Sequence, residues 1–230
     1  MIIKAENLFK RYIYKAETIN AVNGVGLEVK QGEFISMMGP SGSGKTTLLD
    51  LIGCLTSLSE GRLVVLGEDV SSYKENKLVK IRRGKIGFIF QEFFLIPTLT
   101  ALENVELAMM FARMKTDRKK AKDLLVKVGL EHRIGHYPKQ MSGGEKQRVA
   151  VARSLAASPE ILLADEPTGN LDTRTSQEIF SLFTRLNKQD GLTIIMCTHD
   201  FKLGMQAQRM VFLKDGKIVT KDQSGFFSFS

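Results

Sequence analysis

The chain has 230 residues with a formal net charge of +8, and 43% of its residues are hydrophobic. These values are typical of one globular domain, or one domain with an inserted lobe, and they exclude disordered, collagen-like and disulfide-stapled chains. No stretch of about 18 consecutive apolar residues could span a membrane, and the charged N-terminus does not predict a signal peptide. The two cysteines, Cys54 and Cys197, are expected to be reduced core residues of a cytosolic protein.

The first third of the chain predicts strands, a glycine-rich turn and a helix. Apolar and polar residues alternate over residues 2–9 and 21–29, which indicates two half-buried strands. The apolar run at residues 34–38 predicts a buried strand, and a helical pattern of apolar residues follows at 46–54. The next predicted elements are a strand at residues 62–66, a charged helix at 74–83 and a strand at 86–90.

The middle of the chain predicts helices without an intervening strand, which indicates an inserted helical lobe. These helices are expected at residues 101–114, 117–128 and 144–157. Strand and helix patterns then alternate again, and this alternation predicts an α/β protein with a largely parallel core sheet. The strands are expected at residues 161–164 and 193–197, the helix between them at 173–187, and a hairpin at 210–219.

A phosphate-binding loop is predicted between the strand at residues 34–38 and the helix that follows it. Its glycines would let backbone N–H groups wrap a phosphate, and the helix N-terminus would add positive potential. Lys45 is expected to reach the β- and γ-phosphates, and the Thr46 hydroxyl to bind Mg²⁺. The residues that fit the pattern G-x-x-x-x-G-K-[ST] are Gly39, Pro40, Ser41, Gly42, Ser43, Gly44, Lys45 and Thr46.

Two adjacent carboxylates, Asp165 and Glu166, end the apolar strand predicted at residues 161–164. A buried strand can deliver an acid to Mg²⁺ beside the phosphate loop, and Asp165 suits that role. Glu166 is the candidate base for the water that attacks the γ-phosphate. Together with the phosphate loop, the two carboxylates predict a site of nucleotide hydrolysis.

A second anion site is predicted where Ser142, Gly143 and Gly144 precede a helix. An ordinary helix cap would show the same three residues. The Lys-Gln-Arg sequence that follows, together with the surrounding motifs, favours the anion site.

Five motifs occur in the order found in ATP-binding-cassette (ABC) ATPases: the phosphate loop, Gln91, the turn at residues 141–145, Asp165–Glu166 and His199. Over essentially its whole length the chain resembles the nucleotide-binding subunit of an ABC transporter. Residues 88–97, 99–105 and 165–172 resemble the subgroup that serves macrolide exporters, lipoprotein-releasing complexes and related efflux systems.

The resemblance implies a single ABC ATPase domain over residues 1–230, built on a P-loop NTPase core of the RecA-like kind. An antiparallel β region is expected at its N-terminal side. The ATP-binding core with this β region is expected at residues 1–90 and 159–230, and the helical signature lobe at 91–158.

The resemblance also implies ATP and Mg²⁺ as cofactors and assigns a role to each motif. His199 is expected to bond the γ-phosphate, and Gln91 to sense Mg²⁺ and the attacking water. The implied catalytic residues are Glu166, His199, Gln91 and Lys45, and the implied metal ligands are Thr46, Gln91 and Asp165. The implied nucleotide-binding residues are Tyr12, the loop from Gly39 to Thr46, Thr47, Ser142, Gly143, Gly144 and Asp172.

The aromatic residue that stacks on adenine in this family resembles Tyr12, which follows Lys10 and Arg11. Tyr14 is an alternative for this role, and a purely structural tyrosine is a third interpretation.

The partners implied are a second copy of the chain and an integral-membrane permease. In a head-to-tail homodimer that encloses two ATP molecules, Ser142, Gly143 and Gly144 would contact the γ-phosphate held by the other subunit, and Asp172 would lie in the loop that crosses the interface. The permease is expected to contact the segment from Gln91 to Val105. Its apolar stretch consists of Phe93, Phe94, Leu95 and Ile96, for which burial under the helical lobe is the alternative.

The predicted function is ATP hydrolysis that powers efflux or extraction of a drug, peptide or lipoprotein through a separate permease, at the cytoplasmic face of the cell membrane. One alternative is an ATPase that regulates a membrane partner in division or cell-wall signalling. The positive charge raises a second alternative, a nucleic-acid-related ABC ATPase, but the coiled-coil inserts and zinc cysteines of such proteins are missing, so no nucleic acid partner is expected. A P-loop kinase would have no need of the turn at residues 141–145.

Two departures from the common signature, Met141 and Glu145 in place of Leu and Gln, leave hydrolysis intact in this interpretation. Three phenylalanines near the C-terminus, Phe226, Phe227 and Phe229, are compatible with docking on the core, contact with a partner or a frayed end.

Overall fold

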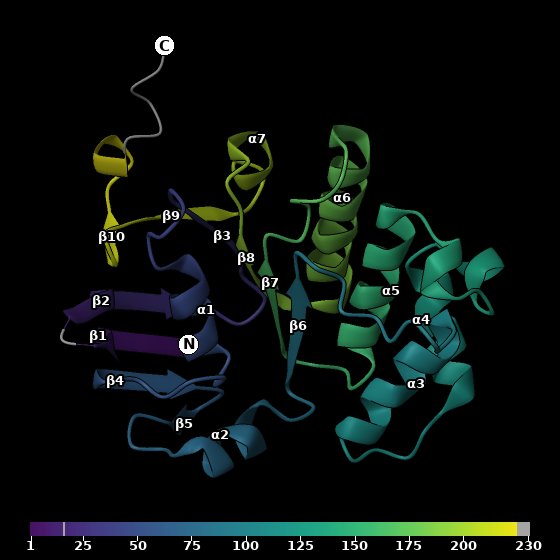
Figure 1. The fold of residues 1–230 in the computed structure, drawn as a ribbon, viewed down its shortest axis with the longest axis horizontal. Coiled ribbons are helices and arrows are strands. Elements are labelled where there is room, and N and C mark those ends of the chain that lie inside the picture. The colour runs from purple at the N-terminus through teal and green to yellow at the C-terminus, as the bar shows by residue number, and fades with distance from the viewer. Residues whose placement is uncertain (16, 225–230) are drawn as a thin grey trace. The chain divides into compact units, whose positions relative to one another are not determined.

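The computed structural model describes residues 1–15 and 17–224 of the chain (Figure 1). The chain forms two compact units: one consists of Met1–Arg82 together with the chain from Ile195 onward, and the other of Arg83–Ile194. Both units contain strands and helices, which confirms the predicted α/β class. The three phenylalanines of the C-terminal tail lie outside the described residues.

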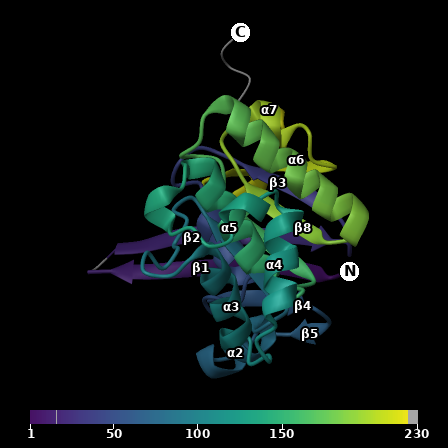
Figure 2. The same cartoon turned by 90° about the vertical axis from the view of Figure 1, so that its right-hand side faces the viewer.

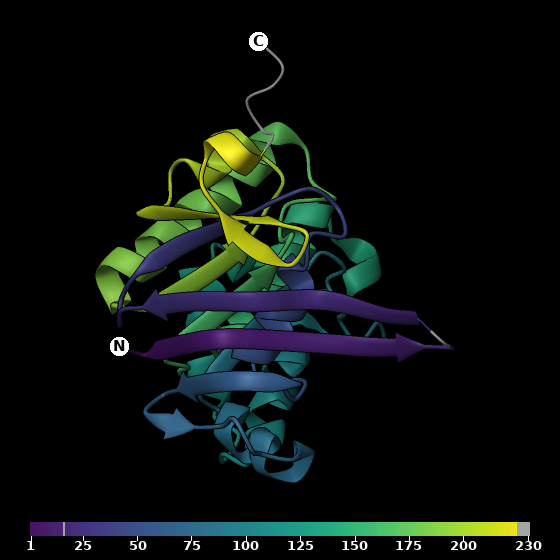
Figure 3. The ribbon, with the colours of Figure 1, turned by 90° about the vertical axis from the view of Figure 1, so that its left-hand side faces the viewer.

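A four-stranded antiparallel sheet of order β2–β1–β4–β5 belongs to the first unit and confirms the predicted N-terminal β region. Its strands are β1 (Ile3–Tyr14), β2 (Glu17–Val29), β4 (Glu60–Val65) and β5 (Glu68–Asp69). Strands β1 and β2 continue past the end of β4 as a two-stranded ribbon (Figure 3). The sequence patterns missed this ribbon because its residues are exposed on both faces and show no alternation of burial.

The first unit also contains strands β3 (Phe34–Met38), β9 (Arg209–Lys214) and β10 (Lys217–Val219). Strand β3 pairs with β9 in parallel, and β9 pairs with β10 in the predicted antiparallel hairpin. The hairpin turn has positive φ angles at Asp215 (50°) and Gly216 (75°), as a two-residue type I′ turn requires. The helices of this unit are α1 (Lys45–Ile52), α2 (Glu75–Arg82) and the short α7 (Phe201–Gly204).

In the second unit, strand β6 pairs in parallel with β7, as the alternation of strands and helices predicted. The helices between these two strands pack on one another (Figure 2), and no strand interrupts them in the described chain. Helix α6 follows β7, and β8 carries the chain from the second unit back into the first. The bounds are β6 (Ile86–Phe90), α3 (Ala101–Phe111), α4 (Arg118–Lys127), α5 (Gly143–Leu155), β7 (Ile161–Asp165), α6 (Thr173–Asp190) and β8 (Thr193–Cys197).

Burial follows the residue patterns of these elements. All five residues of β3 are buried, as a continuous apolar run predicts for an interior strand. Helix α6 buries Ile179, Phe180, Phe183 and Leu186, a helical spacing that leaves its opposite face exposed. Among the described residues no helix has the length and apolar content needed to cross a membrane.

A buried asparagine fixes the loop ahead of α3. The Asn104 side chain is 1% exposed, and its Oδ1 accepts a hydrogen bond from the Ile96 backbone N–H at 2.8 Å. Its Nδ2 donates to the backbone carbonyls of Ile96, Leu99 and Thr100 at 2.9–3.2 Å. One side chain therefore bonds three residues of the irregular segment 96–100, in place of the hydrogen bonds that a helix or strand would supply.

The first prediction concerns this asparagine. Asn104→Ala should lower the free energy of unfolding by about 1 to 3 kcal/mol, because partly buried backbone groups of the loop lose their partners. Urea denaturation measures the change. The matched control is Asn76→Ala on the exposed face of α2, where a change below about 0.5 kcal/mol is expected. Equal effects of the two substitutions would show that Asn104 does not support the loop.

Candidate functional site

The predicted phosphate loop lies between β3 and α1 and packs tightly against its own unit. Gly44 has φ 99° and directly precedes α1, and a Cβ there would overlap the backbone carbonyl oxygen of Ala21 in β2. A Cβ at Gly39 would overlap the carbonyl oxygen of Leu213 in β9. Both positions therefore exclude side chains for steric reasons, and Gly44 also adopts a backbone conformation that favours glycine.

Helix α1 begins without a side-chain cap, because its N-cap is Gly44. The N–H groups of its first turn point into the loop, where a phosphate can accept hydrogen bonds from them. Five other helices begin at a residue whose side chain caps the first turn: Thr100, Asp117, Ser142, Asp172 and Asp200.

Polar groups of the loop complete a site that fits a phosphate. The Lys45 ammonium is largely buried and donates to the carbonyls of Gly39 at 2.8 Å and Pro40 at 3.0 Å, so it spans the loop. The Ser43 hydroxyl is buried and has no hydrogen-bond partner among the described residues. A phosphate oxygen would be a stronger acceptor for both groups than a neutral carbonyl.

The two-stranded ribbon of β1 and β2 carries Tyr12 and Tyr14. Strand β2 is linked to the phosphate loop through the β9–β10 turn. The backbone N–H of Gly216 donates to the Ser43 carbonyl at 3.0 Å, and that of Asn23 donates to the Gly216 carbonyl at 2.8 Å. Tyr12 pairs with Ile19 across the ribbon, and Tyr14 pairs with Glu17, two residues further out. Two residues of strand span about 7 Å, so Tyr12 is the nearer of the two to the phosphate loop along the ribbon.

His199 belongs to the same unit and follows β8. Its neighbours fix the turn: the Asp200 N–H donates to the Thr198 hydroxyl at 3.0 Å, and the Asp200 carboxylate caps α7. Thr198 is buried, whereas His199 is exposed. The imidazole is thus carried on a rigid turn at the end of a buried strand.

The second unit brings Gln91 together with the segment that follows the two carboxylates. Asp165 is the last residue of β7 and pairs with Phe90, directly ahead of Gln91. The Gln91 Nε2 donates to Asn170 Oδ1, and Asn170 Nδ2 donates to the Gln91 carbonyl, each at 3.2 Å. Gly169 lies so close that a Cβ there would be 2.9 Å from Gln91 Nε2.

Glu166 leaves strand geometry with φ 49°, in the left-handed region that non-glycine residues seldom adopt. The Gly169 N–H donates to the Glu166 carbonyl at 3.0 Å. The fully buried Gln147 of α5 donates from Nε2 to the Pro167 carbonyl at 2.6 Å. The backbone on the C-terminal side of Glu166 is therefore fixed from two directions.

The turn at residues 142–144 is both a helix cap and a contact surface for the start of α6. Ser142 and Glu145 form a reciprocal capping box, and Arg133 donates to Glu145 Oε1 at 2.8 Å. A Cβ at Gly144 would overlap the Thr175 methyl group, and Thr175 in turn donates to Asp172 Oδ2 at 2.6 Å. The structure thus connects Gly144 to Asp172 through one threonine.

Among the supporting residues that sequence reasoning missed is Arg153, near the end of α5. Its guanidinium donates to the carbonyls of Phe93 at 3.0 Å and of Phe94, which has φ 45°. Burial lowers the pKa of the Arg153 guanidinium. The available signal was an arginine among the apolar residues of the helix predicted at 144–157, where an unpaired charge would be costly.

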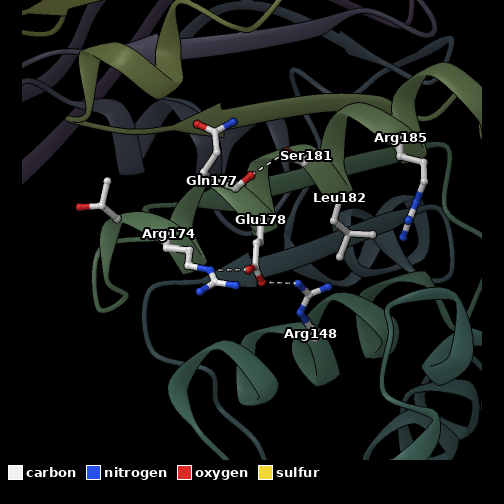
Figure 4. A pocket seen from close by; sticks show the side chains of 8 residues that line it. Arg148, Arg174, Gln177, Glu178, Ser181, Leu182 and Arg185 are labelled. Carbon is white, nitrogen blue, oxygen red and sulfur yellow. Dashed lines mark hydrogen bonds and ion pairs between the residues drawn. The ribbon is translucent and has the colours of Figure 1, made fainter.

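A groove of about 830 Å³ lies between α5 and α6, and the charged side chains that line it bind other parts of the same unit (Figure 4). Arg148 donates to the Val128 carbonyl and Arg185 to the Lys127 carbonyl, so both arginines satisfy the C-terminal end of α4. Glu178 forms ion pairs with Arg148 and Arg174. These guanidinium groups are already engaged by the protein, and the groove lacks the glycine-rich backbone of a nucleotide site.

Comparisons with known proteins identify the family of the chain. A family model described as ABC transporter matches residues 22–169, more than half of the chain. The ABC transporter ATP-binding protein MJ0796 of Methanocaldococcus jannaschii is 46% identical over 228 residues, covering 96% of this chain and 97% of the relative. The macrolide export ATP-binding/permease protein MacB of Vibrio parahaemolyticus is 43% identical over 223 residues, covering 95% of this chain and 34% of MacB.

A solved dimeric structure of MJ0796, in a post-hydrolysis state bound to ADP and Pi, matches with a TM-score of 0.87 at 45% identity. The match covers 95% of this chain and 97% of that one. The chain therefore belongs to the ABC transporter family. As such it is an ATP-binding subunit that hydrolyses ATP to power transport through a membrane permease, which confirms the family and activity predicted from the motifs.

The close packing at Gly44 gives the second prediction. Gly44→Ala should lower the free energy of unfolding by about 2 to 4 kcal/mol and weaken ATP binding more than tenfold, because the new methyl group overlaps the Ala21 carbonyl in a left-handed conformation. Chemical denaturation and calorimetric titration measure the two effects. Gly42→Ala is the stability control, since Gly42 has φ 77° but open space around its Cα, and about 1 kcal/mol is expected. Equal losses of stability would refute a steric role of Gly44.

The third prediction concerns pH and the capping box of α5. The hydrogen bond from the Ser142 N–H, aided by Arg133, lowers the pKa of Glu145 below its ordinary value of 4.5. A lowered folded-state pKa means that ionised Glu145 stabilises the fold above about pH 4.5 and that this stabilisation is lost as the pH falls through the folded-state pKa. Glu145→Gln should therefore cost about 0.5 to 1 kcal/mol at pH 7 and progressively less as the pH falls through the folded-state pKa, which lies below 4.5.

Unfolding by urea at several pH values checks this dependence on Glu145. The Arg133→Gln substitution provides the matched comparison: the double variant should lose less than the sum of the single losses, because both changes remove the same ion pair. A difference between the native protein and Glu145→Gln that stays constant across this pH range would contradict the assignment.

Proposed function

We propose that the chain binds ATP with its phosphates in the loop at residues 39–47 and its base against Tyr12. The observation that carries this proposal is the start of α1 at Gly44, where N–H groups without a side-chain cap line a loop that admits no side chain. Lys45 would exchange its two carbonyl partners for phosphate oxygens. The likeness to MJ0796, whose solved dimer holds ADP and Pi, supports the assignment.

Mg²⁺ is the metal that suits the proposed donors. Thr46 offers a hydroxyl, Asp165 a carboxylate and Gln91 an amide, and hard oxygen donors are those that Mg²⁺ prefers. Because Asn170 accepts from the Gln91 nitrogen, the amide oxygen of Gln91 is the atom that would bind Mg²⁺ or water. The ion would neutralise charge on the phosphates when bound.

The catalytic roles follow from the chemistry of the remaining residues. Glu166 accepts the proton of the attacking water, and the backbone on its C-terminal side is held by Gly169 and Gln147. Lys45 and His199 stabilise charge on the γ-phosphate, His199 from its rigid turn at the end of β8. Positioning and charge stabilisation account for most of the rate in such reactions.

The active assembly is a head-to-tail homodimer in this proposal. Ser142, Gly143 and Gly144 offer the N-terminus of α5 to the nucleotide of the other subunit, and Asp172 lies in the loop that crosses the interface. The dimeric MJ0796 structures, 45–46% identical to this chain, support this arrangement.

The permease docks on the segment from Gln91 to Val105. Phe94 and Ile96 are 57% and 41% exposed, while Phe93 and Leu95 are partly buried, so the apolar stretch presents two side chains to a partner. The proposed transport is efflux or extraction of a drug, peptide or lipoprotein, at the cytoplasmic face of the cell membrane. The identity to MacB, a macrolide export ATP-binding/permease protein, supports the export of a drug. Residues 91–158 act as the signature lobe, and residues 1–90 and 159–230 as the ATP-binding core.

The fourth prediction tests the base. Glu166→Gln should reduce ATP turnover by about 10² to 10⁴-fold, because an amide does not accept the proton of water, while an ATP-bound dimer still forms. Phosphate release measures turnover, and light scattering on a sizing column measures the dimer. The control is Glu160→Gln, an exposed carboxylate at the other end of β7. Turnover near the native rate would remove Glu166 from this role.

A further inference from the structure

Lys10 joins the ring of Tyr12 to a distant turn of the same unit. Its ammonium nitrogen lies 5.1 Å from the centroid of the Tyr12 ring. The same nitrogen donates to the Thr56 hydroxyl at 2.9 Å and to the Ser57 carbonyl at 2.7 Å. Both acceptors lie just after α1, the helix that begins at the phosphate loop. The desolvation that accompanies these contacts lowers the pKa of Lys10.

We propose that Lys10 is a positioning residue that holds the Tyr12 ring in place for the adenine base. This inference rests on the proposed nucleotide site and specifies how its base-binding end is built. The ammonium takes one face of the ring in a cation–π contact, which leaves the opposite face for the base. A ring held in advance loses less rotational freedom when the base binds, and this strengthens binding.

The position of Tyr12 on the ribbon makes such support necessary. Tyr12 is 42% exposed, and it lies on a two-stranded ribbon that extends past β4 (Figure 3). An isolated two-stranded ribbon is marginally stable in water. Lys10 precedes Tyr12 by two residues on the same strand, so their side chains share one face of β1. The hydrogen bonds to Thr56 and Ser57 tie that face to the turn after α1.

The two ends of α1 thereby support the two ends of the nucleotide. Its N-terminus, at Gly44, belongs to the phosphate loop, and the turn after its C-terminus holds Lys10 and through it the Tyr12 ring. A short helix is a rigid spacer, so the distance from the loop to this anchor is set by the fold rather than by the ribbon.

The Tyr14 ring also contacts a lysine ammonium, but among the described residues that lysine has no hydrogen bonds to the turn after α1. Tyr14 and its lysine are therefore a matched control. The Lys15 ammonium lies 5.5 Å from the centroid of the Tyr14 ring. Lys15 is the next residue in the chain, and the pair lies at the exposed tip of the ribbon. Among the described residues, Lys15 makes no hydrogen bond to another part of the unit, whereas Lys10 joins its tyrosine to the turn after α1.

The experiment is a calorimetric titration of the purified full chain with ADP, which binds without being hydrolysed. Lys10→Met should weaken ADP binding about five- to tenfold, because the cation–π contact and the anchor are lost together. Lys15→Met should change it less than about twofold. Lys10→Arg, which retains a cation that stacks on aromatic rings, should restore most of the affinity. Inorganic tripolyphosphate, which has no base, should bind the native chain and all three variants equally.

Kinetics separate positioning from a general effect on structure. Lys10→Met should raise KM for ATP while changing kcat less than about twofold, since Lys10 touches no reacting atom. If Lys10→Met fails to fold, Thr56→Val removes one anchor of the ammonium and should weaken ADP binding about two- to threefold without affecting tripolyphosphate.

Three results would overturn the inference: ADP binding unchanged by Lys10→Met, a larger loss with Lys15→Met than with Lys10→Met, or parallel losses of ADP and tripolyphosphate binding. In each of these cases the native chain still binds ADP. Absence of ADP binding by the native chain would refute the proposed nucleotide site itself, so the two failures are distinguishable.

Discussion

The first unit depends on one close approach of backbone to backbone, at Gly44. A side chain there would overlap the Ala21 carbonyl, and the neighbouring Gly216 N–H donates to Ser43 while its carbonyl accepts from Asn23. Strand β2, the phosphate loop and the β9–β10 turn, which are remote in sequence, therefore meet without intervening side chains. Because main chains are stiffer than side chains, this contact fixes the loop more firmly than a packed leucine would. The uncapped start of α1 is available to a phosphate only because the loop is held in this way.

Helix α5 has a comparable part in the second unit. Its first residue follows the Ser142 cap, Gln147 in its second turn holds the Pro167 carbonyl, and Arg153 near its end holds the carbonyls of Phe93 and Phe94. A single rigid element thus contacts the proposed signature turn, the segment after the proposed base and the segment proposed to meet the permease. A displacement of α5 would therefore move these three segments together. Coupling between them does not require a chain of flexible side-chain contacts.

Motifs and hydrophobic patterns predicted most strands and helices because those elements bury one face or one stripe. They failed where burial does not alternate: the ribbon that carries Tyr12 was missed, and so were the two-residue β5 and the single-turn α7. The motif residues could be identified because phosphate chemistry restricts them to glycine, lysine and acids at fixed spacing. The residues that support the site could not be identified in this way. Lys10, Asn104 and Arg153 contact residues that only the tertiary structure brings near, and nothing in the sequence distinguishes them from other lysines, asparagines and arginines.

Two residues of the second unit with strained backbone angles lie where such supports act. Glu166 and Phe94 both have left-handed backbone angles, φ 49° and 45°, which cost roughly 1 kcal/mol or more for residues with a Cβ. A side chain of α5 donates a hydrogen bond at each place. Gln147 donates to the carbonyl of the residue after Glu166, and Arg153 donates to the carbonyl of Phe94 itself. Strained conformations persist only when their surroundings over-determine them. The buried Gln147 and the partly buried Arg153 are therefore best understood as the groups that keep the proposed base and the proposed docking segment in conformations that the local sequence alone would not adopt.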